Sequence, residues 1–160
     1  MRVIAIDPGY DRLGIAIIEK EKNKKEVLVY SECFQTDSKK DFNIRVGYIG
    51  KKIREIIEKF SPNYMAIETL FFSKNTKTAL KVSESRGVVI FQAVDNNIPV
   101  YEFSPNQIKV AVTGYGQASK KDMYTLTARL IDLGSGDQID DEIDAIATGL
   151  TFFAINPQKY

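Results

Sequence analysis

Two carboxylates close short apolar runs of this sequence. Asp7 follows the run Val3–Ile6 and precedes a Pro-Gly pair, and Glu68 follows the run Tyr64–Ile67. Short runs that are apolar on both faces predict buried strands, and Pro-Gly predicts a turn at the strand end. Ligands of open α/β sheets bind at the carboxyl ends of strands, where a buried carboxylate needs a positive partner. We interpret Asp7 and Glu68 as candidate metal ligands, with an ordinary turn-capping role as the alternative for Asp7.

A third group of acids lies near the C-terminus. Residues 137–144 include five carboxylates and no basic residue: Asp137, Asp140, Asp141, Glu142 and Asp144. Side chains three residues apart on a helix share a face, so Asp141 and Asp144 are expected to point the same way at the start of a helix from about Ile139 to Phe153. Small and apolar residues follow at once, which indicates that this face packs against the rest of the protein. A solvated acidic helix start is the alternative interpretation.

The residue types that are missing narrow the chemistry. The sequence contains no His and a single Cys, Cys33, which excludes His-based triads, His general bases and zinc sites that use His. The metal chemistry that remains is that of carboxylates, which suits Mg²⁺ or Mn²⁺. Four carboxylates on two strand ends and one helix can hold two ions about 3.5–4 Å apart, which stabilise the attacking and the leaving oxygen of a phosphodiester displacement.

The elements that must position these acids follow from hydrophobic periodicity. Three strands joined by short turns, over about 2–7, 13–19 and 27–33, predict an antiparallel N-terminal meander. Apolar residues at three- and four-residue steps predict a helix over 42–60, and the strand that follows, 64–68, is expected to run parallel to the first. Further helices are predicted over about 76–96, from 105, over 120–130 and after the C-terminal acids, with a strand over 98–103. Gly14 and Gly87 are expected to mark close packing.

These elements predict an α/β fold with a mixed five-stranded sheet flanked by helices, in a single domain over residues 1–160. The net charge is +1, so contact with nucleic acid depends on local basic patches. One Cys cannot form an intrachain disulfide and fits a reducing compartment. No apolar segment reaches the length of a membrane span, so we predict a cytoplasmic protein without membrane contact.

Six motifs occur in one order and spacing: Ile4–Gly9, Ala66–Glu68, Phe71–Asn75, Ala79–Lys81, Ser85–Gly87 and Asp141–Ala147. Over nearly its whole length the chain resembles the RuvC family of Holliday-junction resolvases, which have a ribonuclease H-like fold. The resemblance implies a homodimeric, Mg²⁺-dependent endonuclease that makes paired symmetric nicks in four-way DNA junctions during recombination and repair. A branch-migration motor complex is an implied partner.

The resemblance also implies the ligand set. Two Mg²⁺ ions per site, replaceable by Mn²⁺, would be held by the four acids that match the family's ligands: Asp7, Glu68, Asp141 and Asp144. Many members carry a His near the third of these positions, whereas this chain has no His and the ligand set consists of acids alone. The choice between Asp140 and Asp141 therefore stays open.

Aromatic and basic side chains around the acids are candidates for DNA contact. Phe71 or Phe72, just beyond Glu68, is interpreted as stacking against a base near the scissile phosphate. Two basic patches are interpreted as binding the DNA backbone; they comprise Lys74, Lys77, Lys81 and Arg86, and Lys109, Lys120 and Lys121. The helix start at Ser119 adds backbone N–H donors for a phosphate. The alternatives are core packing for the aromatic pair and solvated helix faces for the basic residues.

Three other functions compete with this interpretation. A related ribonuclease H-like nuclease could act on other branched DNA or on RNA, and a non-catalytic DNA-binding module could keep the same fold. An ATPase of the actin and sugar-kinase class is suggested by Asp7-Pro8-Gly9 followed by Gly14, which is similar to the first phosphate turn of that class. The chain is much too short for the two domains that such an ATPase needs.

Overall fold

The strand β1 (Arg2–Asp7) occupies the centre of a five-stranded sheet. It pairs antiparallel with β2 (Arg12–Glu19), which in turn pairs antiparallel with β3 (Val27–Gln35). On its other side β1 pairs parallel with β4 (Tyr64–Glu68), which pairs parallel with β5 (Val100–Phe103). The computed structural model describes residues 1–70, 76–134 and 138–156 and, at residues 76 and 77, the backbone only. The predicted meander and mixed sheet are confirmed.

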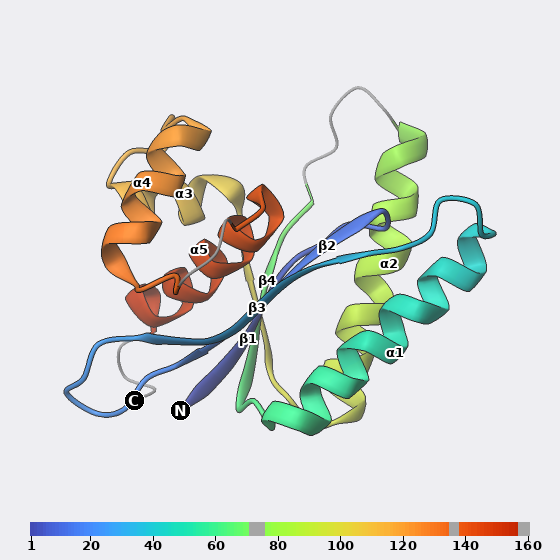
Figure 1. Cartoon of the computed structure of the whole chain (residues 1–160), viewed down its shortest axis with the longest axis horizontal. Helices are drawn as coiled ribbons and strands as arrows, with labels where there is room; N and C mark the ends of the chain where they lie inside the picture. The colour runs from blue at the N-terminus through green and yellow to red at the C-terminus, as the bar shows by residue number, and fades with distance from the viewer. Residues whose placement is uncertain (71–75, 135–137, 157–160) are drawn as a thin grey trace.

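Helices cover both faces of this sheet (Figure 1). α1 (Phe42–Phe60) and α2 (Thr76–Asp95) lie on one face, and α3 (Pro105–Thr113), α4 (Lys120–Leu130) and α5 (Asp140–Ile155) lie on the other. α5 packs directly on β1 and β2, while α3 and α4 pack on α5. Within the described residues, no helix is both long and apolar enough to cross a membrane.

Element boundaries depart from the prediction at a few strand ends. β5 begins at Val100 rather than Ile98, because residues 96–98 close the end of α2: the Ile98 N–H donates to the Ala93 carbonyl over 2.9 Å. β2 and β3 are longer than predicted and pair as far as Arg12 and Gln35. This extension places Arg12 inside the sheet, next to the turn that follows Asp7.

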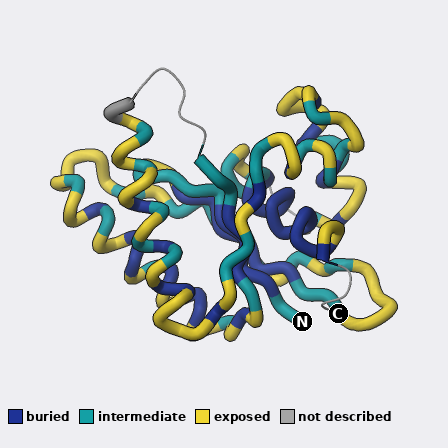
Figure 2. Tube along the Cα trace, turned by 180° about the vertical axis from the view of Figure 1, so that it is seen from behind, coloured by how far each residue is buried: buried dark blue, intermediate teal, exposed yellow. Residues whose placement is uncertain are grey.

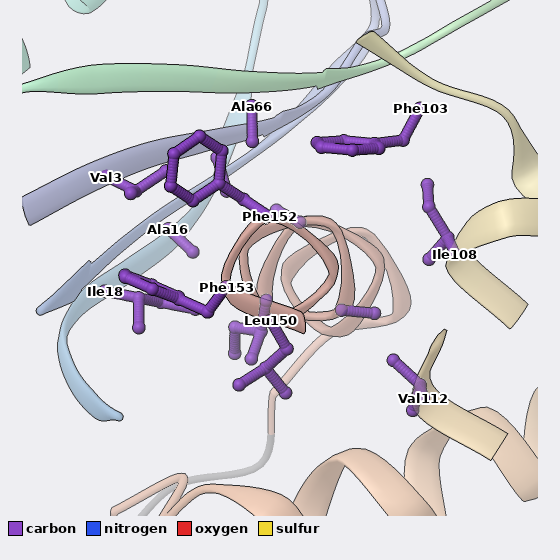
Figure 3. Close-up of a cluster of buried hydrophobic side chains, with 14 of the residues drawn as sticks. Val3, Ala16, Ile18, Ala66, Phe103, Ile108, Val112, Leu150, Phe152 and Phe153 are labelled. Carbon is purple, nitrogen blue, oxygen red and sulfur yellow. The ribbon is translucent and has the colours of Figure 1, made fainter. Parts of the chain in front are cut away.

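The two faces of the sheet carry side chains of different size. Successive strand residues point to opposite faces, so small residues such as Ala5, Ala16 and Ala66 face α5, whereas isoleucines such as Ile4 and Ile17 face α1 and α2. Phe152 and Phe153, which belong to α5, fill the space between this helix and the strands (Figure 3). The sheet and α5 together form the buried centre of the molecule (Figure 2). Small side chains on one face let α5 lie unusually near the strands.

Two glycines show how near α5 lies. A Cβ on Gly149 would be 2.7 Å from Ile18 Cδ1, and a Cβ on Gly14 would be 2.0 Å from the Asp141 carbonyl oxygen. The prediction of close packing at Gly14 is confirmed. The same prediction for Gly87 is wrong for the single chain: a Cβ there meets nothing within 4 Å, because Gly87 lies on the exposed outer face of α2.

Replacing Gly14 tests whether this approach matters for stability. We expect Gly14→Ala to lower the free energy of unfolding by about 1–3 kcal/mol, because the added methyl group forces the start of α5 away from β2. Urea denaturation followed by circular dichroism measures the change. The matched control is Gly47→Ala on α1, where a Cβ meets nothing within 4 Å; it should stabilise the protein by up to about 1 kcal/mol. Equal effects of the two changes would contradict the packing argument.

Candidate active site

Asp7 and Glu68 end two neighbouring parallel strands, β1 and β4. Each lies two residues after an alanine that faces α5, Ala5 and Ala66, so both carboxylates point to the α5 side of the sheet. The first turns of α5 bring Asp144 to the same place, where it lines one pocket with Glu68. Its negative charge there raises the pKa values of both strand-end carboxylates. The acids predicted from the two strand ends and the C-terminal helix therefore lie together.

The electrostatics of this cluster are those of crowded, partly buried acids. Burial raises the pKa of Asp7 to about 8, helped by the negative charges of Glu68, Asp144 and Asp141. Burial, and then the charge of Asp144, raises the pKa of Glu68 to about 7. Burial also raises the pKa of Asp144. Burial and mutual repulsion disfavour the charged form of these carboxylates, and a bound cation would offset both.

Residues Lys109 and Lys120 are basic groups at the edge of these acids. They line a pocket of about 170 Å³ with Glu68 and Asp144, between α3, α4 and α5. Lys109 lowers the pKa of Glu68, and Lys120 lowers the pKa of Asp7, in each case against the larger effect of burial. The sequence placed both lysines in a DNA-binding patch, but it gave no sign that they share a pocket with the acids.

The two neighbouring acids of α5 have different surroundings. The side chain of Asp140 is 74% exposed and its Oδ2 lies 3.6 Å from Lys120 Nζ. The side chain of Asp141 is 21% exposed, pairs with Arg12, and accepts a hydrogen bond from Cys33 Sγ at 3.8 Å. Asp141 is among the charges that raise the pKa of Asp7, whereas Asp140 is not. Both acids raise the pKa of Asp144, but the lower exposure of Asp141 and its effect on Asp7 place it nearer the centre of the cluster.

The basic patch that the sequence predicted on α2 has other contacts. Arg86 Nε donates to the Glu68 carbonyl oxygen at 3.1 Å, and its guanidinium pairs with Glu102 of β5. Lys81 Nζ lies 5.5 Å from the ring centre of Tyr10 and 5.4 Å from that of Phe42. Arg86 thus fixes the end of β4, a role that the sequence did not indicate.

Three of the remaining predicted DNA contacts have no described position, and a fourth has only a described backbone. Phe71, Phe72 and Lys74 lie outside the described residues, and the side chain of Lys77 is likewise not described. Ser119 and Lys121 are exposed at the start of α4. The predicted helix start is confirmed, because Ser119 caps α4 and its hydroxyl accepts a hydrogen bond from the Asp122 N–H.

A buried arginine that sequence reasoning missed holds the turn after Asp7. Arg45 of α1 is 6% exposed; it donates to the Tyr10 carbonyl oxygen at 3.1 Å and to Thr36 Oγ1 at 2.8 Å, and it pairs with Asp11. Its position on the apolar side of a predicted helix was the available signal. These contacts fix the backbone that leads away from Asp7.

The donor set fits a hard divalent cation, because it consists of carboxylate oxygens on a partly buried surface. Within the described parts of the chain, no three acidic, Cys or His side chains form a ready-made cage for a metal ion. Catalytic Mg²⁺ does not need such a cage, since it is usually bound by one or two carboxylates together with water and substrate phosphates. The arrangement is that of an open site, which a phosphate group would complete.

The pKa values predict how metal-free stability depends on pH. Folding raises the pKa of Asp7 from 3.8 to about 8, so the stability that this group contributes is present below pH about 4 and is lost as the pH rises to about 8. We expect Tm of the metal-free protein to fall between pH 5 and pH 8, and Mg²⁺ to raise Tm more at pH 8. Scanning calorimetry measures both effects.

Asp7→Asn should flatten this pH dependence and reduce the response to Mg²⁺. Asp95→Asn is the control, because Asp95 lies at the exposed end of α2. A Tm increase with Mg²⁺ that is the same at both pH values in the unmodified protein would contradict the assignment of these acids as a cation site.

Proteins of one known family are similar to this chain in sequence. The family model described as Crossover junction endodeoxyribonuclease RuvC matches residues 3–152, a range that contains all four acids. Proteins with that same name from Finegoldia magna and Brachyspira hyodysenteriae are similar to the chain. The first is 38% identical over 160 residues, covering 100% of this chain and 97% of that protein. The second is 41% identical over 158 residues, covering 98% of this chain and 96% of that protein.

Solved structures agree. The structure titled "T. thermophilus RuvC in complex with Holliday junction substrate" superposes on this chain with a TM-score of 0.91 at 29% identity. The superposition covers 99% of this chain and 96% of the other. The same fold, spanning almost the same length, is thus found in a protein that was solved with its branched DNA.

Proposed function

The chain belongs to the RuvC family of crossover junction endodeoxyribonucleases, and we propose that it resolves four-way DNA junctions by metal-dependent hydrolysis of paired phosphodiester bonds. One observation carries the proposal: partly buried acids from β1, β4 and α5 gather in a chain that matches this family over residues 3–152. The relative from T. thermophilus was solved with a Holliday junction. The alternative of an actin-like ATPase has no support from these relatives.

We assign the metal to the four acids Asp7, Glu68, Asp141 and Asp144. Mg²⁺ held there would lower the pKa of the attacking water and stabilise the leaving oxygen of the phosphodiester, and two ions would act on both oxygens at once. Asp7 has the central place, because it is coupled electrostatically to the three other acids. Mn²⁺ is the expected substitute, since it accepts the same oxygen ligands.

Lys109 and Lys120 act on the substrate side of the same pocket. Both line it together with Glu68 and Asp144, so a phosphate that enters meets positive charge directly beside the acids. Preorganised cations of this kind stabilise the negative charge that develops in phosphoryl transfer. Lys121 and the start of α4 at Ser119 extend the positive surface. Stacking of Phe71 or Phe72 on a base, and contact of Lys74 and Lys77 with the DNA backbone, remain predictions.

A homodimer follows from the two-fold symmetry of the substrate, because paired nicks need two active sites. The outer face of α2 supports it. Small and apolar residues at helical spacing form an exposed stripe on this face. The stripe comprises Leu80, Ser83, Gly87, Phe91 and Val94. Leu80, Phe91 and Val94 are 60%, 57% and 62% exposed. Gly87 in the middle of the stripe allows a second helix to come near. We assign this α2 stripe as the interface between two copies.

A motor partner and the cytoplasmic location remain proposals. The family resemblance is the reason to expect a branch-migration complex. The single cysteine is compatible with a reducing compartment. Co-sedimentation with such a motor on junction DNA would test the first of these two proposals.

Cleavage of synthetic DNA tests the proposed activity. In the presence of Mg²⁺ the protein should convert a four-way junction into two nicked duplexes, as seen on denaturing gels. Asp7→Asn and Asp141→Asn should each reduce the rate more than about 100-fold, beyond the loss typical of residues that only support a metal ligand. Asp140→Asn is the matched control and should keep most activity. Linear duplex or RNA–DNA hybrid cut at the same rate as the junction would overturn the junction assignment.

The oligomeric state tests the interface. We expect the double variant Phe91→Glu and Val94→Glu to convert a dimer into a monomer, because two buried carboxylates would replace apolar contacts in each copy. Sedimentation velocity measures the mass. Val110→Glu on α3 is the control, since Val110 is 47% exposed on another face of the protein. Dissociation of the control, or persistence of the double variant as a dimer, would place the interface elsewhere.

A further inference from the structure

One acid of the cluster already has a positive partner within the chain. The guanidinium of Arg12 forms an ion pair with Asp141 Oδ2. Cys33 Sγ donates to the same oxygen at 3.8 Å. The carboxylate of Asp141 is therefore engaged by groups from β2 and β3, the two strands that lie on the other side of β1 from Glu68.

The fold brings this arginine to the acid through the register of the sheet. Arg12 and Gly14 point to the same face of β2, and Gly14 is the register partner of Asp7 in β1 and of Cys33 in β3. Because Gly14 has no side chain, the backbone of Asp141 rests directly on β2. Arg12, two residues earlier, then reaches the Asp141 carboxylate from outside.

The pair is suited to be broken. The side chain of Arg12 is 46% exposed, and ion pairs at this degree of exposure are weak because water competes for both charges. Without Arg12, Asp141 would add one more unpaired negative charge beside Asp7, which already has Glu68 and Asp144 as negative neighbours. With Arg12 in place, one carboxylate oxygen of Asp141 is not available to a metal ion.

We propose that Arg12 is an internal competitor of the metal: it holds Oδ2 of Asp141 in the metal-free enzyme and must release this oxygen before it can act as a ligand. The proposal rests on the proposed function, because it takes Asp141 to be a metal ligand. It adds a positioning residue that keeps the acid cluster intact before metal arrives and weakens binding of metal in the absence of DNA.

Metal binding without DNA tests the competition. Titration of the whole protein with Mn²⁺, with free Mn²⁺ measured by electron paramagnetic resonance, gives the dissociation constant directly. Arg12→Gln should bind Mn²⁺ about 2- to 5-fold more tightly than the unmodified protein, because the competing charge has gone. Arg12→Lys should lie between the two. Lys24→Gln, which removes the same charge from an exposed pair with Glu21 far from the acids, should change nothing.

The opposite role makes the opposite prediction. If Arg12 orients Asp141 for the metal, Arg12→Gln will bind Mn²⁺ more weakly, and that result would overturn the proposal; so would an affinity equal to that of the unmodified protein. Arg12→Lys provides the same comparison should Arg12→Gln fail to fold. Failure of the proposed function is recognised separately, because Asp7→Asn would then bind Mn²⁺ as tightly as the unmodified protein.

Discussion

The close contact between α5 and the small-residue face of the sheet is the constraint on which the active site depends. Ala5, Ala16 and Ala66 leave room for the helix, and Gly149 lets it settle against Ile18 and Ala5. The acids of β1 and β4 have fixed positions at the strand ends, so the distance from α5 to the sheet decides whether its own acids reach them. A displacement of about 1 Å can cost an enzyme about 100-fold in rate. The packing of α5 on the alanine face therefore determines whether Asp141 and Asp144 reach Asp7 and Glu68.

The isoleucine face has a different function. Larger side chains there, such as Ile4, Ile17 and Ile67, bury apolar area against α1 and α2 without any need for close approach. Burial of such side chains contributes about 1.5–3 kcal/mol each. Both faces of the sheet therefore contribute stability, and the α5 face in addition sets the geometry of the acids.

The sequence was sufficient to predict the parts of the site that follow from local patterns. Asp7 and Glu68 were predicted because each ends an apolar run, and Asp144 because it lies one turn after the start of an apolar helix. Arg86 and Lys81 could not be placed, since long flexible side chains choose their partners only after the tertiary structure has formed. The role of Arg12 could not be predicted, because its partner, Asp141, is distant in the sequence and meets it only when α5 packs on β2.

The positive charges of the site illustrate the same limit. The chain as a whole carries a net charge of +1, which says nothing about the local field. In the folded protein Lys109 and Lys120 come from different helices to one pocket and partly offset the charges of Glu68 and Asp144. Only the packing of α3 and α4 against α5 creates that arrangement, and no spacing in the sequence encodes it visibly.

Arg86 connects the proposed interface helix α2 with Glu68 of the active site. It belongs to α2, next to Gly87 in the α2 stripe, and it holds the backbone of Glu68 by a hydrogen bond of 3.1 Å. If two copies meet along that stripe, the helix that carries the contact also carries the brace of an active-site acid. Association of the copies and alignment of Glu68 would then be mechanically linked. Such a link would favour cutting by assembled pairs over cutting by single subunits, and so protect a branched chromosome from being nicked on one strand alone.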